Sequence, residues 1–222
     1  MISFTAVHKR YPGGVEALKN ASFTIADREM VLVTGHSGAG KSTLLKLMAA
    51  IERPTSGTVV VNGQNVASIG PRAIPYLRRN FGLVFEDHKL LFDRSAFDNV
   101  MLPLDIVGFD RREAARRVRA ALDKVGLLHK ERAYPITLSG GEQRRLGIAR
   151  AIVHRPAMLL ADDPTGNVDV EHARQLCELF RSFHQVGVTV VIATHDEQLT
   201  QHLGSRRIAL REGAIVVHSV PA

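Results

Sequence analysis

The sequence predicts an α/β fold, a parallel sheet with an antiparallel β subdomain and an inserted α-helical subdomain. Three observations predict it. The continuous apolar run at 31–34 is followed by a glycine-rich loop and a segment of helical period at 41–50. Buried-strand runs return at 157–161 and 188–194, after a middle region at 69–138 that is mostly of helical period. Strands that alternate with helices in this way pair in parallel.

The N-terminal third supplies the antiparallel part. Residues 20–26 are a strand candidate, and the β-branched run at 58–61 leads into Asn62 and Gly63. Asn-Gly is a strong hairpin signal because both residues tolerate the positive φ of a tight turn. We therefore expect hairpins beside the parallel sheet.

The clearest helix of the middle region is predicted at 111–125. Val118, Ala121, Leu122 and Val125 recur there at the i, i+3, i+4 and i+7 positions of one helix face. This apolar face indicates a helix that packs on one side only.

The length of 222 residues fits one domain with an inserted lobe. Hydrophobic residues make up 45% and charged residues 23%, which excludes a disordered chain. We expect a single domain over 1–222, with the core at 1–86 and 157–222 and the helical subdomain at 87–156.

Cysteine content and the N-terminal residues bear on the compartment. Cys177 is the one cysteine, which excludes an intrachain disulfide and favours a reducing compartment. The charges at 8–10 leave no room for a signal peptide, and no apolar run approaches the roughly 18 residues of a membrane-spanning helix. We expect a cytoplasmic chain that reaches a membrane only through a partner or its own surface.

The chain carries an excess of positive charge. Lysine and arginine number 29 against 22 aspartate and glutamate, a net charge of +7. The excess permits an anionic partner or simply supports solubility. Aromatic residues make up only 5%, and no basic stretch is interleaved with them to stack bases. We therefore expect no nucleic-acid partner.

Residues 35–42 read G-H-S-G-A-G-K-S and match the G-x-x-x-x-G-K-[ST] phosphate loop. The position after a strand and before a helix is the one the mechanism requires, which disfavours a glycine-rich turn without a ligand. Lys41 would reach the β- and γ-phosphates, and the Ser42 hydroxyl would hold Mg²⁺. The predicted nucleotide-binding residues here are Gly35, His36, Ser37, Gly38, Ala39, Gly40, Lys41, Ser42 and Thr43.

A second apolar strand at 158–162 ends in a carboxylate, which is typical of a Walker B strand. Asp162 is predicted to hold Mg²⁺ directly or through water. Asp163 follows at once, where a nucleotide hydrolase keeps the group that polarises the attacking water. The alternative for two adjacent aspartates is a solvated loop, which the phosphate loop elsewhere in the chain disfavours.

Residues 138–143 read L-S-G-G-E-Q and resemble the signature motif of the ABC-type ATPases. The order of phosphate loop, signature, Walker B strand and the segment 194–196 is similar to that family across the whole chain. The resemblance implies that two subunits enclose two ATP molecules with Mg²⁺. Each nucleotide would contact the phosphate loop of one subunit and a second set in the other, Ser139, Gly140, Gly141 and Glu142.

The same resemblance implies three further roles. Tyr11 would stack on adenine, His195 would contact the γ-phosphate, and 166–169 would cross the dimer interface. The alternatives are a strand-end aromatic for Tyr11 and a structural histidine for His195.

Two positions depart from the family pattern. Glu86 stands where the family has a glutamine that senses the γ-phosphate and the metal, and Asp163 stands where it has the catalytic glutamate. Aspartate is shorter by one methylene, and a misplacement of about 1 Å can cost roughly a hundredfold in rate. Both residues remain predicted catalytic residues, with Glu86 also a predicted metal ligand, and we expect slow hydrolysis.

A narrower resemblance joins 85–94, 98–100 and 102–104 to the ATP-binding subunits of bacterial cell-division complexes. It implies an ATP-dependent homodimer on the cytoplasmic face of the inner membrane, bound to an integral-membrane partner that regulates septal cell-wall hydrolysis. The cytoplasmic division machinery is a further candidate partner. Residues 160–167 are shared more widely, so the alternative is the ATPase subunit of a lipoprotein-release or macrolide-export transporter.

Two groups of residues bear on the membrane partner. The apolar side chains Leu90, Leu91, Phe92 and Phe97 form a predicted docking cluster, with core packing as the alternative. The segment 111–119 also carries five arginines that predict a solvated face or attraction to anionic lipid. These are Arg111, Arg112, Arg116, Arg117 and Arg119.

Overall fold

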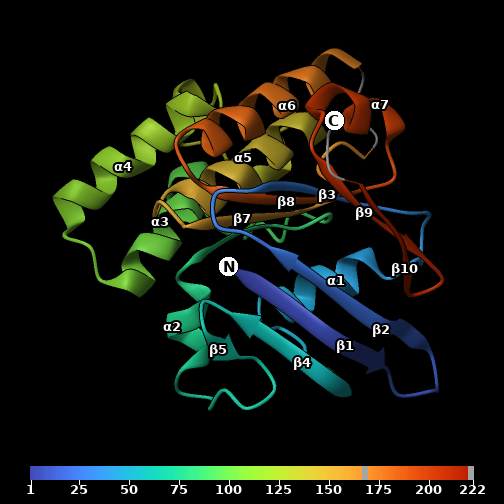
Figure 1. The fold of residues 1–222 in the computed structure, drawn as a ribbon. Coiled ribbons are helices and arrows are strands. Elements are labelled where there is room, and N and C mark those ends of the chain that lie inside the picture. The colour runs from blue at the N-terminus through green and yellow to red at the C-terminus, as the bar shows by residue number, and fades with distance from the viewer. Residues whose placement is uncertain (167–169, 220–222) are drawn as a thin grey trace.

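The computed structural model describes residues 1–166 and 170–219, in which the strands form two sheets (Figure 1). Within these residues the larger sheet has six strands in the order β10-β9-β3-β8-β7-β6. All neighbours in it pair in parallel except β9 and β10. Its strands are β3 (Met30–Thr34), β6 (Phe81–Val84), β7 (Met158–Asp162), β8 (Thr189–Thr194), β9 (Arg206–Arg211) and β10 (Ala214–Ser219).

The smaller sheet is antiparallel throughout and has the order β2-β1-β4-β5 in the described residues. The predicted turn at Asn62 and Gly63 joins β4 to β5, and both residues have positive φ. The predicted strand at 20–26 is the second half of a longer β2. The strands are β1 (Ile2–Arg10), β2 (Glu16–Ile25), β4 (Ser56–Val61) and β5 (Gln64–Asn65).

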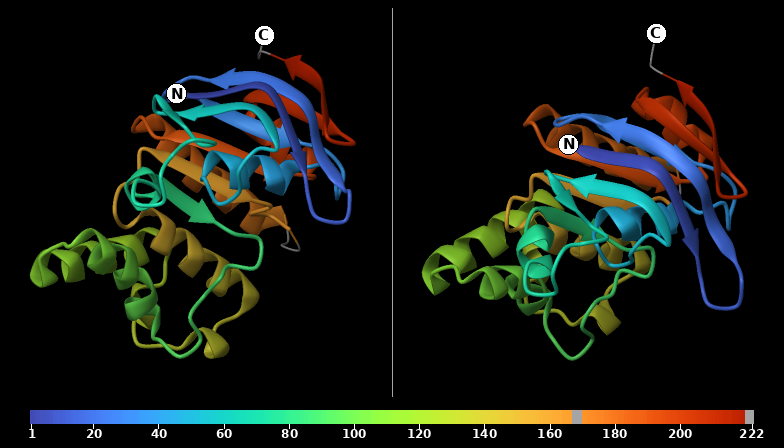
Figure 2. Two further views of the ribbon diagram at one scale, coloured as in Figure 1. Left: turned by 90° about the horizontal axis from the view of Figure 1, so that it is seen from below. Right: turned by 60° about the horizontal axis from the view of Figure 1, so that its bottom comes forward.

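Helices cover both faces of the larger sheet (Figure 1). Figure 2 shows α3 and α4 on the far side of that sheet from the antiparallel strands, with α1 between the two sheets. Helix α3 packs against α4 and α5. The helices are α1 (Lys41–Met48), α2 (Ile74–Arg78), α3 (Ala96–Val107), α4 (Arg111–Lys124), α5 (Gly140–Ile152), α6 (Val170–Gln185) and α7 (Glu197–Leu203), with 3-10 turns at Leu128–Lys130 and Pro135–Thr137.

The core forms two apolar clusters, one on each face of the larger sheet. Along β3, Met30 and Leu32 belong to the cluster shared with α3 to α6, whereas Val31 and Val33 belong to the cluster shared with α1 and the antiparallel sheet. This alternation follows from the two-residue period of a strand. Burial on both faces explains why the strand is apolar without interruption.

The predicted α/β class is confirmed, and the predicted helix at 111–125 is α4. The region 69–138, predicted to be mostly helical, contains α2, α3 and α4. It also contains β6, a strand that was not predicted and that pairs with β7 at the sheet edge. Strand β6 has only four residues, and one is Gly82, where a Cβ would lie 2.4 Å from the Ala151 carbonyl oxygen. Close packing against α5 therefore selects glycine and hides the strand pattern. Strands β1, β9 and β10 and helices α6 and α7 were not predicted.

In the part of the chain that the structure describes, no helix is both long and apolar enough to cross a membrane.

Candidate active site

The phosphate loop links β3 to α1, and its glycines are required by close backbone contacts. Gly35 has φ 151° and Gly40 has φ 108°. A Cβ on Gly35 would lie 2.4 Å from the Leu210 carbonyl oxygen, and one on Gly40 would lie 2.4 Å from that of Ala17. The loop therefore packs closely between β9 and β2. The N–H groups in the first turn of a helix have no acceptor within the helix, so those at the start of α1 can bind an anion.

Lys41 is buried within this loop, with 9% of its surface exposed. Its Nζ donates to the carbonyl oxygens of Gly35 at 2.8 Å and His36 at 3.0 Å. Backbone carbonyls hold the ammonium in place without neutralising its charge. The loop therefore keeps a fixed cation beside the first turn of α1.

The Walker B strand meets the loop through one hydrogen bond. Ser42 Oγ donates to Asp162 Oδ1 at 3.0 Å. Strands β3 and β7 both flank β8 and run parallel, so their carboxyl ends reach the same edge of the sheet. This is the edge at which ligands bind in open α/β sheets.

The pKa of Asp162 is raised, chiefly by burial, and the charges of Glu86 and Asp163 raise it further. The Ser42 hydrogen bond and the charge of Lys46 act in the opposite direction. Carboxylate and hydroxyl oxygens gathered in this way suit a hard divalent cation. Among the described residues no three His, Cys, Asp or Glu side chains are close enough to hold a metal alone. The site thus fits Mg²⁺ only if water or phosphate oxygens complete its shell.

Asp163 pairs with His195 beyond the ends of β7 and β8. Asp163 Oδ2 lies 3.2 Å from His195 Nδ1, and the two side chains are 15% and 60% exposed. The Asp163 N–H donates to the Ala193 carbonyl oxygen at 2.8 Å, so backbone contacts fix the carboxylate beside β8. Carboxylate and imidazole together form an arrangement that can orient a water molecule.

Tyr11 lies on the other side of the loop. Its hydroxyl is 3.3 Å from Thr43 Oγ1, and Lys9 Nζ lies 4.8 Å from its ring centroid. Lys9 in turn pairs with Glu52 at 2.8 Å. These contacts orient an aromatic ring at the mouth of the site.

Most predicted site residues line one pocket of about 400 Å³. Three predicted loop residues do not line the pocket. Ala39 is buried, Gly35 packs closely against Leu210 and Ala39, and His36 Nδ1 lies 2.7 Å from the Ser37 carbonyl oxygen. Val15, Glu16 and Ala17 line the pocket without having been predicted. The predicted residues that line it are Tyr11, Ser37, Gly38, Gly40, Lys41, Ser42, Thr43, Glu86, Asp162, Asp163 and His195.

The signature segment does not line this pocket. Ser139 caps α5, and its Oγ accepts from the Glu142 N–H at 3.3 Å while Glu142 Oε2 accepts from the Ser139 N–H at 2.9 Å. Lys130 Nζ lies 2.6 Å from Glu142 Oε1. The Lys130 hydrogen bond is the first cause that lowers the pKa of Glu142 to about 2. Glu142 is therefore engaged in the helix cap, while Gly140 and Gly141 leave the helix N-terminus uncovered.

Two further predictions concern segments beside the site. Of the predicted interface loop, Gly166 is described, and 167–169 lie outside the described residues. The predicted docking cluster is divided: Leu90 is buried, Phe97 is half-buried beneath Arg119, and Phe92 is 54% exposed. For Leu90 the core-packing alternative therefore holds, because its side chain belongs to the apolar core.

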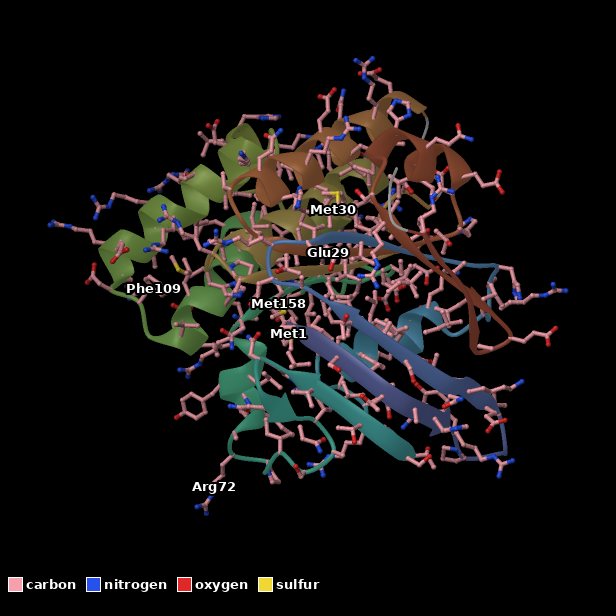
Figure 3. All side chains as sticks on the ribbon, in the orientation of Figure 1. Met1, Glu29, Met30, Arg72, Phe109 and Met158 are labelled. Atoms are coloured by element: carbon pink, nitrogen blue, oxygen red, sulfur yellow. The ribbon has the colours of Figure 1, made fainter. Side chains whose placement is uncertain are left out.

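The arginines of α4 mostly face solvent. Nitrogen-tipped side chains project from α4 in Figure 3, where Phe109 is labelled between α3 and α4. Two of them also make side-chain contacts. Arg117 pairs with Glu113 at 2.7 Å and lies 4.4 Å from the Phe109 ring centroid, and Arg119 pairs with Glu131 at 2.9 Å and lies 5.4 Å from that of Phe97. The solvated-face alternative fits this arrangement.

Sequence reasoning missed two arginines on α5. Arg150 donates to the carbonyl oxygens of His88 at 2.6 Å and Lys89 at 2.7 Å, both in the loop after Glu86. Arg144 donates to the Gly166 carbonyl oxygen at 2.5 Å. Both arginines donate to backbone carbonyl groups of segments that are distant in the sequence, so no residue pattern predicts these contacts. Their position in the helix of the signature motif was the available signal.

The sequence and the fold are similar to those of known proteins. The family model described as "ABC transporter" matches residues 18–166. The chain is 51% identical to the cell division ATP-binding protein FtsE of Escherichia coli (strain K12) over 96% of both chains. It is 42% identical to that of Bacillus subtilis (strain 168), over 97% of this chain and 95% of the relative.

A solved structure agrees over the whole fold. The dimeric post-hydrolysis state of the ATP-binding cassette MJ0796, bound to ADP and Pi, superposes with a TM-score of 0.94 at 31% identity, covering 100% of this chain and 99% of that one.

Fold, phosphate loop and Walker B strand define a nucleotide-binding ATPase. The chain belongs to the ABC transporter family, as an ATP-binding cassette that binds and hydrolyses ATP. The predicted likeness to the cell-division ATP-binding proteins is confirmed.

Proposed function

We propose that this chain is the ATP-hydrolysing subunit of an FtsEX-type cell-division complex. It couples ATP-driven dimerisation to an integral-membrane partner that regulates septal cell-wall hydrolysis. The observation that carries the ATPase part is the 3.0 Å contact between Ser42 and Asp162, which joins the phosphate loop to the Walker B strand. Relatives called cell division ATP-binding proteins, which match nearly the full chain, support the division part.

The phosphate loop would bind the β- and γ-phosphates. Lys41 would exchange its contacts with the Gly35 and His36 carbonyls for phosphate oxygens, and backbone N–H groups at the start of α1 would supply further donors. Tyr11 would stack on the adenine from the other side of the loop. The nucleotide thus meets groups that the free chain already holds in place.

Ser42, Asp162 and Glu86 would hold Mg²⁺ with the phosphates. The bound ion would neutralise charge on the phosphate oxygens. The raised pKa of Asp162 supports this role, because crowded carboxylates favour a cation among them.

Asp163 and His195 would orient the attacking water. The water oxygen bonds to the γ-phosphorus while the bond from that phosphorus to the bridging β-phosphate oxygen breaks. Asp163 would accept the proton that the attacking water releases, and the bridging oxygen would leave as part of ADP. His195 would stay beside the γ-phosphate through its contact with Asp163. The short Asp163 side chain supports slow turnover.

The second half of the site would come from another copy of the chain. Ser139, Gly140 and Gly141 present an uncovered helix N-terminus that lies outside the pocket of their own chain. Such an N-terminus attracts anions. Glu142 would act by fixing Ser139 within the cap. The likeness to a cassette solved as a dimer supports this arrangement.

The helical subdomain at 87–156 would carry the membrane contact, on the cytoplasmic face of the inner membrane. Phe92 is exposed, whereas Asn99 holds the loop behind it through hydrogen bonds to Leu91 and Arg94. A rigid loop that presents an aromatic side chain suits a partner helix. An FtsX-like protein is the proposed partner, and the cytoplasmic division machinery is a second candidate.

Two measurements test the proposal together. One is co-purification of the chain with an FtsX-like membrane protein, and the other is its rate of ATP hydrolysis. Phe92→Asp should abolish co-purification at any ionic strength and leave ATP binding intact. Arg116→Gln, a charge change on the exposed face of α4, is the matched control and should retain the partner. The docking role of Phe92 is contradicted if Phe92→Asp and the wild-type chain capture the partner equally. The division role is contradicted if the wild-type chain captures none.

A further inference from the structure

The turn from Asp163 to Gly166 follows the Walker B strand and is tightly built. Asp163 has φ 45°, which is unusual for a residue other than glycine. The Gly166 N–H donates to the Asp163 carbonyl oxygen at 3.2 Å. A Cβ on Gly166 would lie 2.8 Å from Asp163 Oδ2. The position of the carboxylate therefore depends on how this turn is held.

Buried polar atoms without hydrogen-bond partners gather at this turn. Among the described residues, five buried side-chain atoms lack a partner, and two of them, Asp163 Oδ1 and Thr165 Oγ1, belong to the turn. A third is Arg144 Nε on α5. Since buried polar atoms are nearly always paired, such a group at one place points to function.

Arg144 reaches the turn from the signature helix. Its guanidinium donates to the Gly166 carbonyl oxygen at 2.5 Å. Burial lowers the pKa of Arg144, and the charge of Asp163 opposes that change. A guanidinium has several donors in a fixed plane, so a second donor remains available while the first holds the backbone.

Resting on the proposed role of Asp163, we propose that Arg144 is a positioning residue for the Asp163 carboxylate. It anchors the turn through the Gly166 carbonyl and thereby fixes the backbone segment that carries the Asp163 carboxylate. The other carboxylate oxygen, Oδ2, is held by His195 at 3.2 Å. Arg144 and His195 would thus fix the carboxylate from two elements, so that it points at the attacking water.

Single-turnover hydrolysis tests this role, with the chain in excess over Mg-ATP and at a concentration that binds all of the nucleotide. Arg144→Gln should slow the hydrolysis step by about tenfold to a hundredfold, because an oriented group is displaced. The affinity for Mg-ATP should change by less than about twofold, since Arg144 does not line the nucleotide pocket. Arg144→Lys, which keeps a cation able to reach the Gly166 carbonyl, should recover part of the rate. Arg116→Gln is the control for loss of charge.

A double-mutant cycle separates positioning from a general structural role. In an Asp163→Ala background, Arg144→Gln should change the residual rate by less than about twofold. Equal losses in both backgrounds would overturn the proposal, as would an unchanged rate in Arg144→Gln alone or a loss of ATP binding with it. If Asp163→Ala alone leaves the rate unchanged, the proposed role of Asp163 fails instead, which distinguishes the two failures.

Discussion

The phosphate loop and the turn after the Walker B strand lie at the same edge of the sheet, yet they differ in how complete they are. In the loop, Lys41 and Ser42 both have partners, and close backbone contacts fix Gly35 and Gly40. In the turn that begins at Asp163, buried polar atoms remain unpaired. The loop that binds nucleotide therefore has its key polar groups paired, whereas the turn proposed to activate water has not.

The difference has a physical basis. A phosphate loop needs only its own strand and helix, so local backbone contacts can build it before any ligand arrives. Asp163 contacts His195, which follows β8, and the turn after Asp163 is bound by Arg144 of α5. The signature segment that is proposed to complete the site lies outside the pocket. Binding can therefore be local, while hydrolysis needs distant segments to meet.

The largest expected effect comes from removing the fixed cation of the loop. Lys41→Ala should weaken Mg-ATP binding by about 2 to 4 kcal/mol, which is roughly 30-fold to 1000-fold in the dissociation constant. Calorimetric titration measures it, with Lys46→Ala as a control in the same helix. Unchanged affinity would mean that the loop is not the binding half.

The next largest effect concerns Asp163, in the turn proposed to activate water. Asp163→Glu should raise turnover at least about tenfold, because the longer side chain brings the carboxylate roughly 1 Å closer to the water. Adding Glu86→Gln should give a further gain that is not additive, since both residues meet the same phosphate and metal. Steady-state ATPase assays decide this. A wild-type chain as active as the variant would show that the shorter carboxylate already reaches its water.

A smaller effect is expected when the charge of Asp162 is removed, which should stabilise the nucleotide-free chain but weaken nucleotide binding. The folded-state pKa of Asp162 is raised, so its ionisation costs stability as the pH rises through that pKa. Asp162→Asn should therefore raise the unfolding midpoint of the nucleotide-free chain at neutral pH and weaken Mg-dependent ATP binding. A lower midpoint would indicate that the carboxylate stabilises the free chain.

The smallest expected effect concerns the helix cap of the signature segment. The pKa of Glu142 is lowered to about 2, so its stabilising contribution is present above its unfolded-state pKa and is lost as the pH falls from about 4.5 towards 2. The stability difference between the wild type and Glu142→Gln should shrink over that range in denaturant titrations. A difference that stays constant across it would place the stabilisation outside the Lys130 and Ser139 contacts.

The sequence was sufficient to predict features whose residues are contiguous in the chain. The phosphate loop, the Walker B strand and helix α4 each carry their own pattern. Strand β6 was missed because Gly82 is selected by a contact with Ala151 rather than by strand period. Arg144 was missed because its partner is a carbonyl group 22 positions away. Contacts to backbone leave no trace in the residue type of the partner.

The rate of ATP hydrolysis as a function of protein concentration tests most directly whether one chain can bind ATP but needs a second copy to hydrolyse it. At low nanomolar concentration the chain should bind Mg-ATP and hydrolyse almost none of it. At saturating Mg-ATP, the turnover rate per chain should rise steeply as the concentration enters the range where copies associate, because a second copy then supplies its signature segment. A rate per chain that stays constant across the same range would contradict the account, since each chain would then contain a complete hydrolytic site.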